Sequence, residues 1–156
     1  MSTHIPSYRK GIAAVIFRKK GDDLEYLVLY GKEWKLLKGT ERNMSERSVL
    51  DKEMKDEVNL KAKKVQIITY RIKYEFPRWR EKGYFRKGQD LQVYAVEVDP
   101  EAQVQLDYEE NFDFHWAKLE EAKGLLKFED HKEALEKADK YIRKQLELER
   151  KLQKSD

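Results

Sequence analysis

The chain has 156 residues and a formal net charge of +3 at pH 7, with charged and apolar residues each making up 40% of the sequence. This length and composition are typical of one folded domain with its own hydrophobic core, so we expect a single domain over residues 1–156. The nearly balanced charge does not by itself indicate nucleic-acid binding, and the absence of cysteine excludes disulfides, zinc–thiolate sites and a cysteine nucleophile.

Two short apolar runs near the N-terminus predict a β-hairpin. Residues 11–17 and 24–30 are rich in β-branched and aromatic side chains, and the polar, glycine-containing segment between them has turn-forming chemistry. A helix is expected further on, because Ser45 is suited to capping an N-terminus. It should run through Glu57 and stop at Asn59, since asparagine tolerates the left-handed conformation in which helices often end.

The second half of the chain predicts further strands and two helices. Residues 65–74 and 91–98 have the apolar patterns of strands, and a shorter strand is expected over residues 112–116. A short helix over residues 119–126 and a long last helix capped by Asp130 should follow. Apolar residues recur at helical spacing in that last helix, at Leu135, Ala138, Ile142 and Leu146. This order predicts an α/β protein with helices on both faces of a mixed sheet.

Three carboxylates in the first predicted helix suggest a metal site. Glu53, Asp56 and Glu57 are spaced i, i+3 and i+4, so they project from one helix face, and Glu46 two turns earlier should point the same way. Like charges at this spacing disfavour a helix unless a cation binds them, and hard ions such as Mg²⁺ prefer carboxylate oxygens. The alternative is a solvated helix face whose acids form ordinary i, i+4 pairs with lysines.

Residues 52–60, K-E-M-K-D-E-V-N-L, resemble the second half of the sequence box of the Nudix hydrolases. That box reads G-x5-E-x7-R-E-U-x-E-E-x-G-U, where U is an aliphatic residue. Lysine stands for arginine, aspartate for glutamate and asparagine for glycine at Lys52, Asp56 and Asn59. The metal-ligand half of the box is therefore retained.

The first half of the box departs from the family pattern. Gly39 resembles the glycine of the family's W-x-x-P-K-G segment but lies one residue too close to Lys52, and Met44 stands where the box has its first glutamate. In the family that glutamate pairs with the arginine and braces the loop against the helix. Here Glu41 or Glu46 is a candidate substitute. Otherwise we expect the loop to be held by the capping serine and by packing of Met44.

The resemblance extends to other segments. Residues 74–77 and 88–94 look like the Y-x-x-P…G-Q-x-Q-x-[WY] run of RNA pyrophosphohydrolases and related diadenosine tetraphosphate hydrolases. Residues 113–119 look like the tryptophan-containing segment that follows a further metal-binding or base glutamate. That glutamate corresponds to Glu110, with Glu109 as second choice.

Taken over roughly residues 9–138, the resemblance implies a Nudix-type α/β/α sandwich. It also implies a hydrolase that cuts nucleoside diphosphate linkages with Mg²⁺ or Mn²⁺ as cofactor. The catalytic groups that it implies are Glu53, Glu57 and Glu110. The metal ligands that it implies are these three side chains, Asp56 and the carbonyl of Gly39.

A long loop is expected between the strands over residues 65–74 and 91–98, and the segment 71–87 is both basic and aromatic. It contains seven basic and two acidic residues, a local charge of +5, interleaved with tyrosine, phenylalanine and tryptophan. Cations and rings together hold phosphates and stack on bases, although a hairpin at a sheet edge would give a similar alternation. Candidates for neutralising phosphate are Lys38, Arg71, Lys82 and Arg86. Candidates for stacking on a base are Tyr74, Trp79 and Tyr84.

The first functional hypothesis is a pyrophosphohydrolase acting on dinucleoside polyphosphates or on the 5′ end of triphosphorylated RNA. The second is a nucleotide- or RNA-binding module of the same fold without turnover, and the third is a scaffold that docks through the last helix. The three histidines (His4, His115 and His131) lack the spacing of a zinc pair, so we expect structural or solvent roles.

We expect a cytoplasmic monomer or homodimer that does not bind membranes. No run approaches the ~20 apolar residues of a membrane span, and residues 1–10 lack the apolar centre of a signal peptide.

Overall fold

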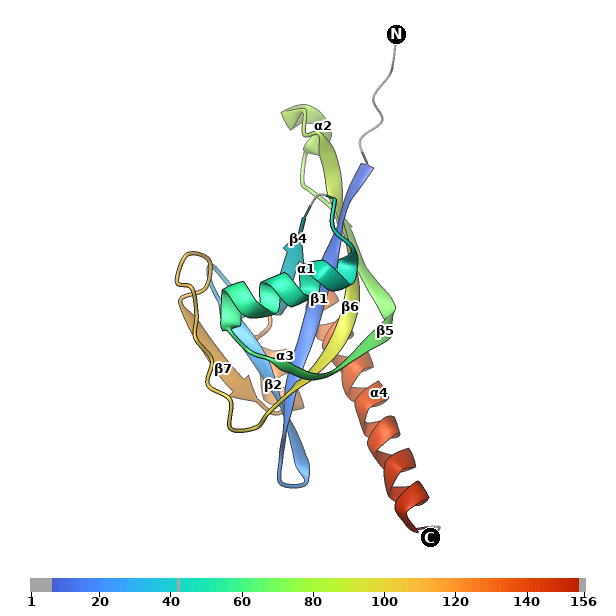
Figure 1. Ribbon diagram of the computed structural model, residues 1–156. Helices are drawn as coiled ribbons and strands as arrows, with labels where there is room; N and C mark the ends of the chain where they lie inside the picture. The colour runs from blue at the N-terminus through green and yellow to red at the C-terminus, as the bar shows by residue number, and fades with distance from the viewer. Residues whose placement is uncertain (1–6, 42, 155–156) are drawn as a thin grey trace.

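The computed structural model describes residues 7–41 and 43–154, and a seven-stranded mixed sheet forms its centre (Figure 1). His4 therefore lies outside the described residues. The strands are β1 (Ser7–Lys20), β2 (Asp23–Tyr30), β3 (Trp34–Lys35), β4 (Leu37–Thr40), β5 (Ala62–Glu75), β6 (Arg86–Val98) and β7 (Asp113–Ala117). The helices are α1 (Glu46–Glu53), the π-helical turn η1 (Met54–Val58), α2 (Trp79–Lys82), α3 (Leu119–Leu125) and α4 (Glu129–Lys154).

Strand β1 is the centre of the sheet. The strand order is β3-β2-β1-β6-β5, with β4 also paired to β1 and β7 to β2. The predicted hairpin is confirmed, because β1 and β2 pair antiparallel up to Lys20 and Asp23, and Gly21 in the turn has a φ of 62°. The remaining length of β1 pairs antiparallel with β4 and parallel with β6.

The two faces of β1 belong to two separate cores. Ile12, Ala14 and Ile16 pack beneath α1 and η1, together with residues of β2 and β6. The alternate residues, such as Val15 and Phe17, pack against α3 and α4. Figure 1 shows α1 crossing one face of the sheet while α3 and α4 lie behind it. The predicted α/β/α arrangement is confirmed.

The helix that carries the acidic residues begins and ends as predicted. The Ser45 hydroxyl oxygen accepts a hydrogen bond from the Ser48 N–H at 3.1 Å, which caps α1. Asn59 ends the helix in the left-handed region, with a φ of 52°. The turn between Met54 and Val58 is π-helical, a form that is wider than an α-helix and frequent at functional sites.

Two predictions about the rest of the chain are wrong. Asp130 does not cap the last helix, because α4 already starts at Glu129 and Asp130 lies within its first turn. The basic segment between β5 and β6 is also not a long loop. Both strands extend into it, and the short helix α2 closes a hairpin that projects from one end of the sheet (Figure 1).

None of the helices in the described part of the chain combines the length and the apolar character needed to cross a membrane.

Candidate functional site

Two buried carboxyl groups lie where α1 passes into η1. Glu53 and Glu57 are only 9% and 6% exposed. Glu53 packs on Gly39 of β4 so closely that a Cβ at Gly39 would lie 2.5 Å from its Cγ. The Glu57 carboxyl forms hydrogen bonds with Glu53 and with Glu110, which lies in the segment before β7. The fold therefore brings three acidic side chains from two distant segments into consecutive contact, and we call these three the acidic line.

Burial makes the ionised forms of Glu53 and Glu57 unfavourable. It is the main cause that raises the pKa of Glu57, and hydrogen bonding to Glu110 and the charge of Glu53 raise it further. Burial also raises the pKa of Glu53, against the opposing effect of the Lys52 ammonium. A divalent cation would favour the ionised carboxylates and so oppose the rise of both pKa values.

The chemistry of these donors fits a hard cation. Across residues 7–41 and 43–154, no three acidic or histidine side chains are arranged to enclose an ion by themselves. Mg²⁺, however, is usually held by one or two carboxylates together with waters and substrate phosphates. The touching pair Glu53 and Glu57 matches that requirement. Asp56 is half exposed and turns toward Lys52, 3.3 Å away.

The loop before α1 has a brace that differs from the expected ones. The Lys52 Nζ lies 3.2 Å from a carboxylate oxygen of Glu41, so Glu41 substitutes for the glutamate that is absent at Met44. The prediction that Met44 packs is wrong, since its side chain is 39% exposed. Glu46 does not join the acidic line either, because its carboxylate pairs with Arg71 on β5 at 3.0 Å.

Lysines line a cavity next to Glu110. A hollow of about 370 Å³ beside Glu110 is lined by Gly31, Lys35, Lys38 and Phe128, among others. Lys35 lies near enough to Glu57 to oppose the rise of its pKa. Burial lowers the pKa of the Lys38 ammonium, and the charge of Lys35 adds to that effect. A cavity lined by both carboxylates and ammonium groups suits a phosphate chain bound with a metal ion.

A second, more apolar cavity adjoins the first at Lys38. It has a volume of about 290 Å³, and Ile72, Tyr74, Pro77 and Phe128 form its apolar lining. The Lys38 Nζ lies 5.7 Å from the ring centre of Tyr74 and 5.9 Å from that of Phe128, so the ammonium stands between the two cavities. An apolar slot next to a cationic one has the character of a site for a base joined to phosphates.

His131 closes the floor of this apolar cavity in its neutral form. Its Nδ1 accepts a hydrogen bond from the Leu36 N–H at 3.2 Å, and the ring is 2% exposed. Burial lowers the pKa of His131 from 6.5 to about 4. The stability that follows from this shift is present above pH 6.5 and is lost as the pH falls toward 4.

We therefore expect His131 alone to lower the free energy of unfolding by about 3 kcal/mol as the pH falls from 6.5 to 4. Urea unfolding of the wild type and of His131→Gln at pH 7.0, 5.5 and 4.5 measures it. The difference between the two proteins should shrink as the pH falls. His115→Gln, at the exposed histidine of β7, is the matched control and should unfold like the wild type at each pH. Equal pH profiles of wild type and His131→Gln would contradict the assignment.

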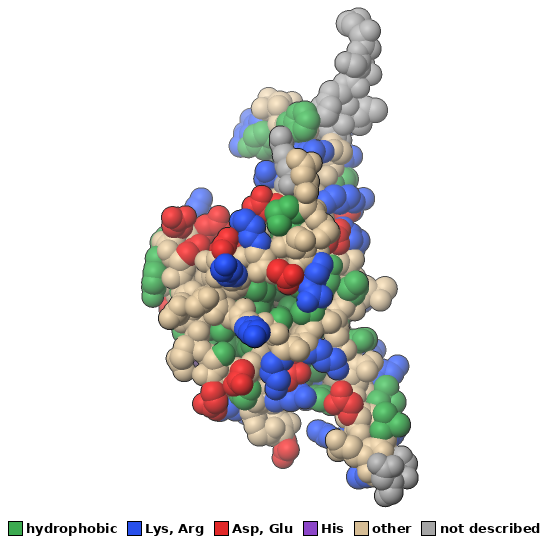
Figure 2. Space-filling model, in the orientation of Figure 1, with side chains coloured by type: hydrophobic (Ala, Val, Ile, Leu, Met, Phe, Trp, Pro, Cys, Tyr) green, Lys and Arg blue, Asp and Glu red, His purple; other side chains and the backbone are tan. Residues whose placement is uncertain are grey.

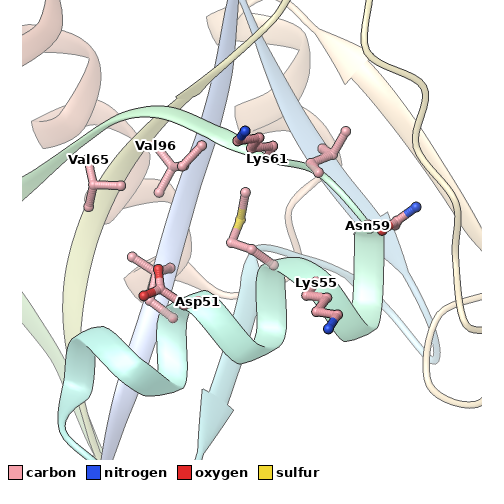
Figure 3. Close-up of a pocket in the computed structure, with 10 residues that line it drawn as sticks. Asp51, Lys55, Asn59, Lys61, Val65 and Val96 are labelled. Atoms are coloured by element: carbon pink, nitrogen blue, oxygen red, sulfur yellow. The ribbon is translucent and has the colours of Figure 1, made fainter.

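A separate hollow lies on the other side of α1 (Figure 3). Its volume is about 320 Å³, and its floor includes Leu50, Met54 and Val96. Asp51 and Lys55 stand at its rim, whereas neither Glu53 nor Glu57 lines it. The two sides of the helix thus have different surroundings.

The remaining predicted substrate-binding residues divide into two groups. Lys38 and Tyr74 lie beside the carboxyl groups, as described above. Arg71 is engaged within the protein by Asp90 at 2.7 Å and by Glu46. The others lie on the projecting hairpin, away from the acids: Trp79, Lys82, Tyr84 and Arg86.

Two residues of the site were not predicted. Lys35 belongs to the same short segment as Lys38, so the alternation of that segment offered a signal for it. Phe128 precedes the last helix, and only the packing of α4 against β5 brings it near Tyr74.

The arrangement matches solved structures of low sequence identity. A C. elegans Ap4A hydrolase in a binary complex superposes with a TM-score of 0.70 at 20% identity, covering 86% of this chain and 97% of that one. A Listeria monocytogenes protein described as a NUDIX hydrolase gives 0.70 at 18% identity over 88% and 95% of the two chains. The E. coli dihydroneopterin triphosphate pyrophosphohydrolase gives 0.59 at 16% identity over 83% and 95%.

By sequence, neither a family model nor a curated protein matches the chain. The likeness therefore rests on three-dimensional structure, and it agrees with the arrangement of sheet and helices described above. The chain has the fold of the Nudix hydrolases.

Proposed function

We propose that the protein is a Mg²⁺- or Mn²⁺-dependent pyrophosphohydrolase that cuts a nucleoside diphosphate linkage. The observation that carries this proposal is the run of contacting acids Glu53, Glu57 and Glu110, because Glu110 lines one cavity together with Lys35 and Lys38. The names of the similar structures, an Ap4A hydrolase and a triphosphate pyrophosphohydrolase among them, support the same reaction class.

Each group has a role in this proposal. Glu53 and Glu57 hold the ion, with Asp56 and the Gly39 carbonyl as further candidate ligands. When bound, the ion supplies positive charge to the phosphate oxygens and activates water for attack. Glu110, the most exposed of the three acids in line, accepts the proton of that water at a carboxylate oxygen.

The two lysines and the apolar cavity bind the rest of the substrate. Lys35 and Lys38 neutralise the phosphate oxygens. The slot between Tyr74 and Phe128 receives a nucleobase, because rings of this kind stack on a base whatever its identity. The bound nucleotide then spans both cavities, with its phosphates beside the lysines and its base in the apolar slot.

Phe128→Ala should raise the KM for a nucleotide substrate by about 10-fold and leave kcat nearly unchanged, because stacking acts equally on bound substrate and transition state. Steady-state kinetics on the best substrate of the panel below measures both constants. Phe114→Ala removes a ring of β7 that lines neither cavity, so it serves as the matched control. A fall in kcat with unchanged KM in Phe128→Ala would place the ring outside the base site.

A substrate panel tests the proposed reaction. The protein is incubated with diadenosine tetraphosphate, 5′-triphosphorylated RNA and nucleoside triphosphates in Mg²⁺ and in Mn²⁺, and the products are separated by ion-exchange chromatography. Reaction in ¹⁸O-labelled water shows which phosphorus is attacked. We expect one substrate class to be hydrolysed, and we expect EDTA to stop the formation of its products. Dinucleoside polyphosphates and 5′-triphosphorylated RNA are the two proposed classes.

The second candidate function is a nucleotide- or RNA-binding module without turnover. One observation favours it: the Lys52 ammonium reaches both Asp56 at 3.3 Å and Glu53 at 3.9 Å, and so offsets part of the negative charge that a metal would use. Saturable binding of a nucleotide with no product in either metal would support this module and refute the hydrolase.

A further inference from the structure

Six basic side chains at the projecting end of the β5–β6 hairpin have no carboxylate partner. Among the described residues, none of them forms an ion pair, although their neighbours do: Lys10 with Asp90 and Arg78 with Glu81. The six are Arg9, Lys73, Arg80, Lys82, Arg86 and Lys87. This end of the molecule therefore presents positive charge that no carboxylate among the described residues neutralises.

Aromatic rings lie directly beneath five of these cations. The ammonium groups of Lys73 and Lys87 lie 4.5 and 4.8 Å from the ring centre of Tyr8. The other three cation–ring distances are Arg80 to Trp79 5.0 Å, Lys82 to Tyr84 5.8 Å and Arg86 to Phe85 5.0 Å. Two of the rings are largely open to solvent, Tyr84 at 42% and Phe85 at 56%. We call these ten residues the hairpin surface; Figure 2 shows blue and green side chains together at this end.

Two shallow hollows run along the hairpin surface, and both are lined by Arg9, Phe85 and Arg86. One, of about 420 Å³, extends to Tyr84 on the hairpin. The other, of about 410 Å³, extends to Glu41 in the loop before α1. Glu41 pairs with Lys52, whose Nζ also lies 3.9 Å from a carboxylate oxygen of Glu53, so one side chain separates the end of this hollow from the carboxyl site.

We propose that the hairpin surface binds a single-stranded polynucleotide, which favours 5′-triphosphorylated RNA over dinucleoside polyphosphates as the substrate class of the site. The inference rests on the proposed function for the position of the 5′ phosphates at Glu53–Glu57. The nucleotides that follow lie along the two hollows, where cations hold the backbone and exposed rings stack on bases. A free mononucleotide has no such continuation and does not use these residues.

The chemistry favours a nucleic acid over an anionic membrane. A membrane-surface segment separates its cations and its apolar side chains onto opposite faces, whereas a surface for single-stranded nucleic acid has rings and cations side by side. The ring-and-cation pairs described above repeat that alternation along the hairpin.

Fluorescence anisotropy with a 5′-hydroxyl, single-stranded RNA of 12 nucleotides tests the surface without turnover. We expect binding that weakens linearly in log–log form with salt. The variant Arg80→Gln/Lys82→Gln/Arg86→Gln should bind about 30-fold more weakly and have a salt slope shallower by about 2, at roughly 0.7 per charge for single strands. The charge-matched control Lys140→Gln/Lys144→Gln/Arg150→Gln, on α4, should bind as the wild type does. A control that weakens binding equally would overturn the proposal.

A second variant separates stacking from charge. Tyr84→Ala/Phe85→Ala should weaken RNA binding while keeping the wild-type salt slope, because no cation is removed. Circular dichroism and thermal melting check that each variant is folded. A single-stranded DNA of the same sequence identifies the preferred sugar, and binding of either strand supports the site. Binding of phosphatidylserine vesicles without binding of either strand would overturn it.

Failure of the hairpin surface can be distinguished from failure of the proposed hydrolase. RNA binding with no hydrolysis of any panel substrate would leave the hairpin surface in place and refute the hydrolase. Hydrolysis of diadenosine tetraphosphate without measurable RNA binding would refute the hairpin surface alone.

Discussion

Glu57→Gln and Glu53→Gln should each lower kcat by at least about 100-fold, because a lost metal ligand removes charge stabilisation of several kcal/mol from the transition state. Both variants should also melt at a higher temperature than the wild type when no metal is present. Burial and the adjacent acids make the ionised carboxyls costly, and a neutral amide removes that cost. Steady-state kinetics in Mg²⁺ and differential scanning calorimetry in EDTA measure the two effects.

Asp51→Asn is the matched control for these variants. Asp51 lies on the same helix but is paired with Arg47 and lines the hollow on the other side, away from the carboxyl groups (Figure 3). Its rate should stay within about twofold of wild type, as expected for a surface pair of little energetic weight. Near-normal rates in both glutamine variants would refute the metal site. Lowered melting temperatures in EDTA would refute the claim that the buried carboxyl groups destabilise the metal-free protein.

Gly39→Ala is expected to lower kcat by about 10- to 100-fold without unfolding the protein, because an error of about 1 Å in the position of a catalytic group has effects of this size. The added Cβ would lie 2.5 Å from Cγ and 2.7 Å from Cδ of Glu53, so that carboxyl must move away. Gly39 does not have a positive φ, which means that its backbone accepts alanine. The change therefore acts on the position of Glu53 rather than on the chain.

Kinetics and Mg²⁺ titration by calorimetry check this prediction, with Gly124→Ala as control. A Cβ at Gly124 meets nothing within 4 Å, and alanine favours the helix α3 in which it lies. The control should keep full activity and melt no lower than the wild type. Full activity and unchanged metal affinity in Gly39→Ala would mean that Glu53 does not bind the ion.

The parts of the fold that depend on local sequence were predictable. The hairpin of β1 and β2 has its signal in two apolar runs and a glycine turn, and the helix has its signals in Ser45 and Asn59. Each of these signals affects only the few residues around it, through a backbone conformation or one hydrogen bond. The spacing of Glu53 and Glu57 likewise placed both on one face, where the structure has them in contact.

The features that depend on distant contacts were not predictable from local patterns. Glu46 was expected to face the other acids. Its carboxylate instead accepts a hydrogen bond from Arg71, which lies 25 residues away on β5. The ion pair between Lys52 and Glu41 and the exposure of Met44 depend on how the loop before α1 packs against the helix. Phe128 and Tyr74 meet only because α4 packs on β5. In each case the tertiary partner, which no single segment reveals, decides where the side chain lies.

The parallel pairing of β1 with β6 also has a consequence for how the molecule is made. β1 finds its antiparallel partners β2 and β4 close by in the chain, but its parallel partner comes from the other half. Closing so long a loop is slow, and a chain that is still being synthesised holds β1 with one edge open until β6 has emerged. An open edge is a template for pairing with other chains, so nascent molecules depend on reaching Val98 quickly.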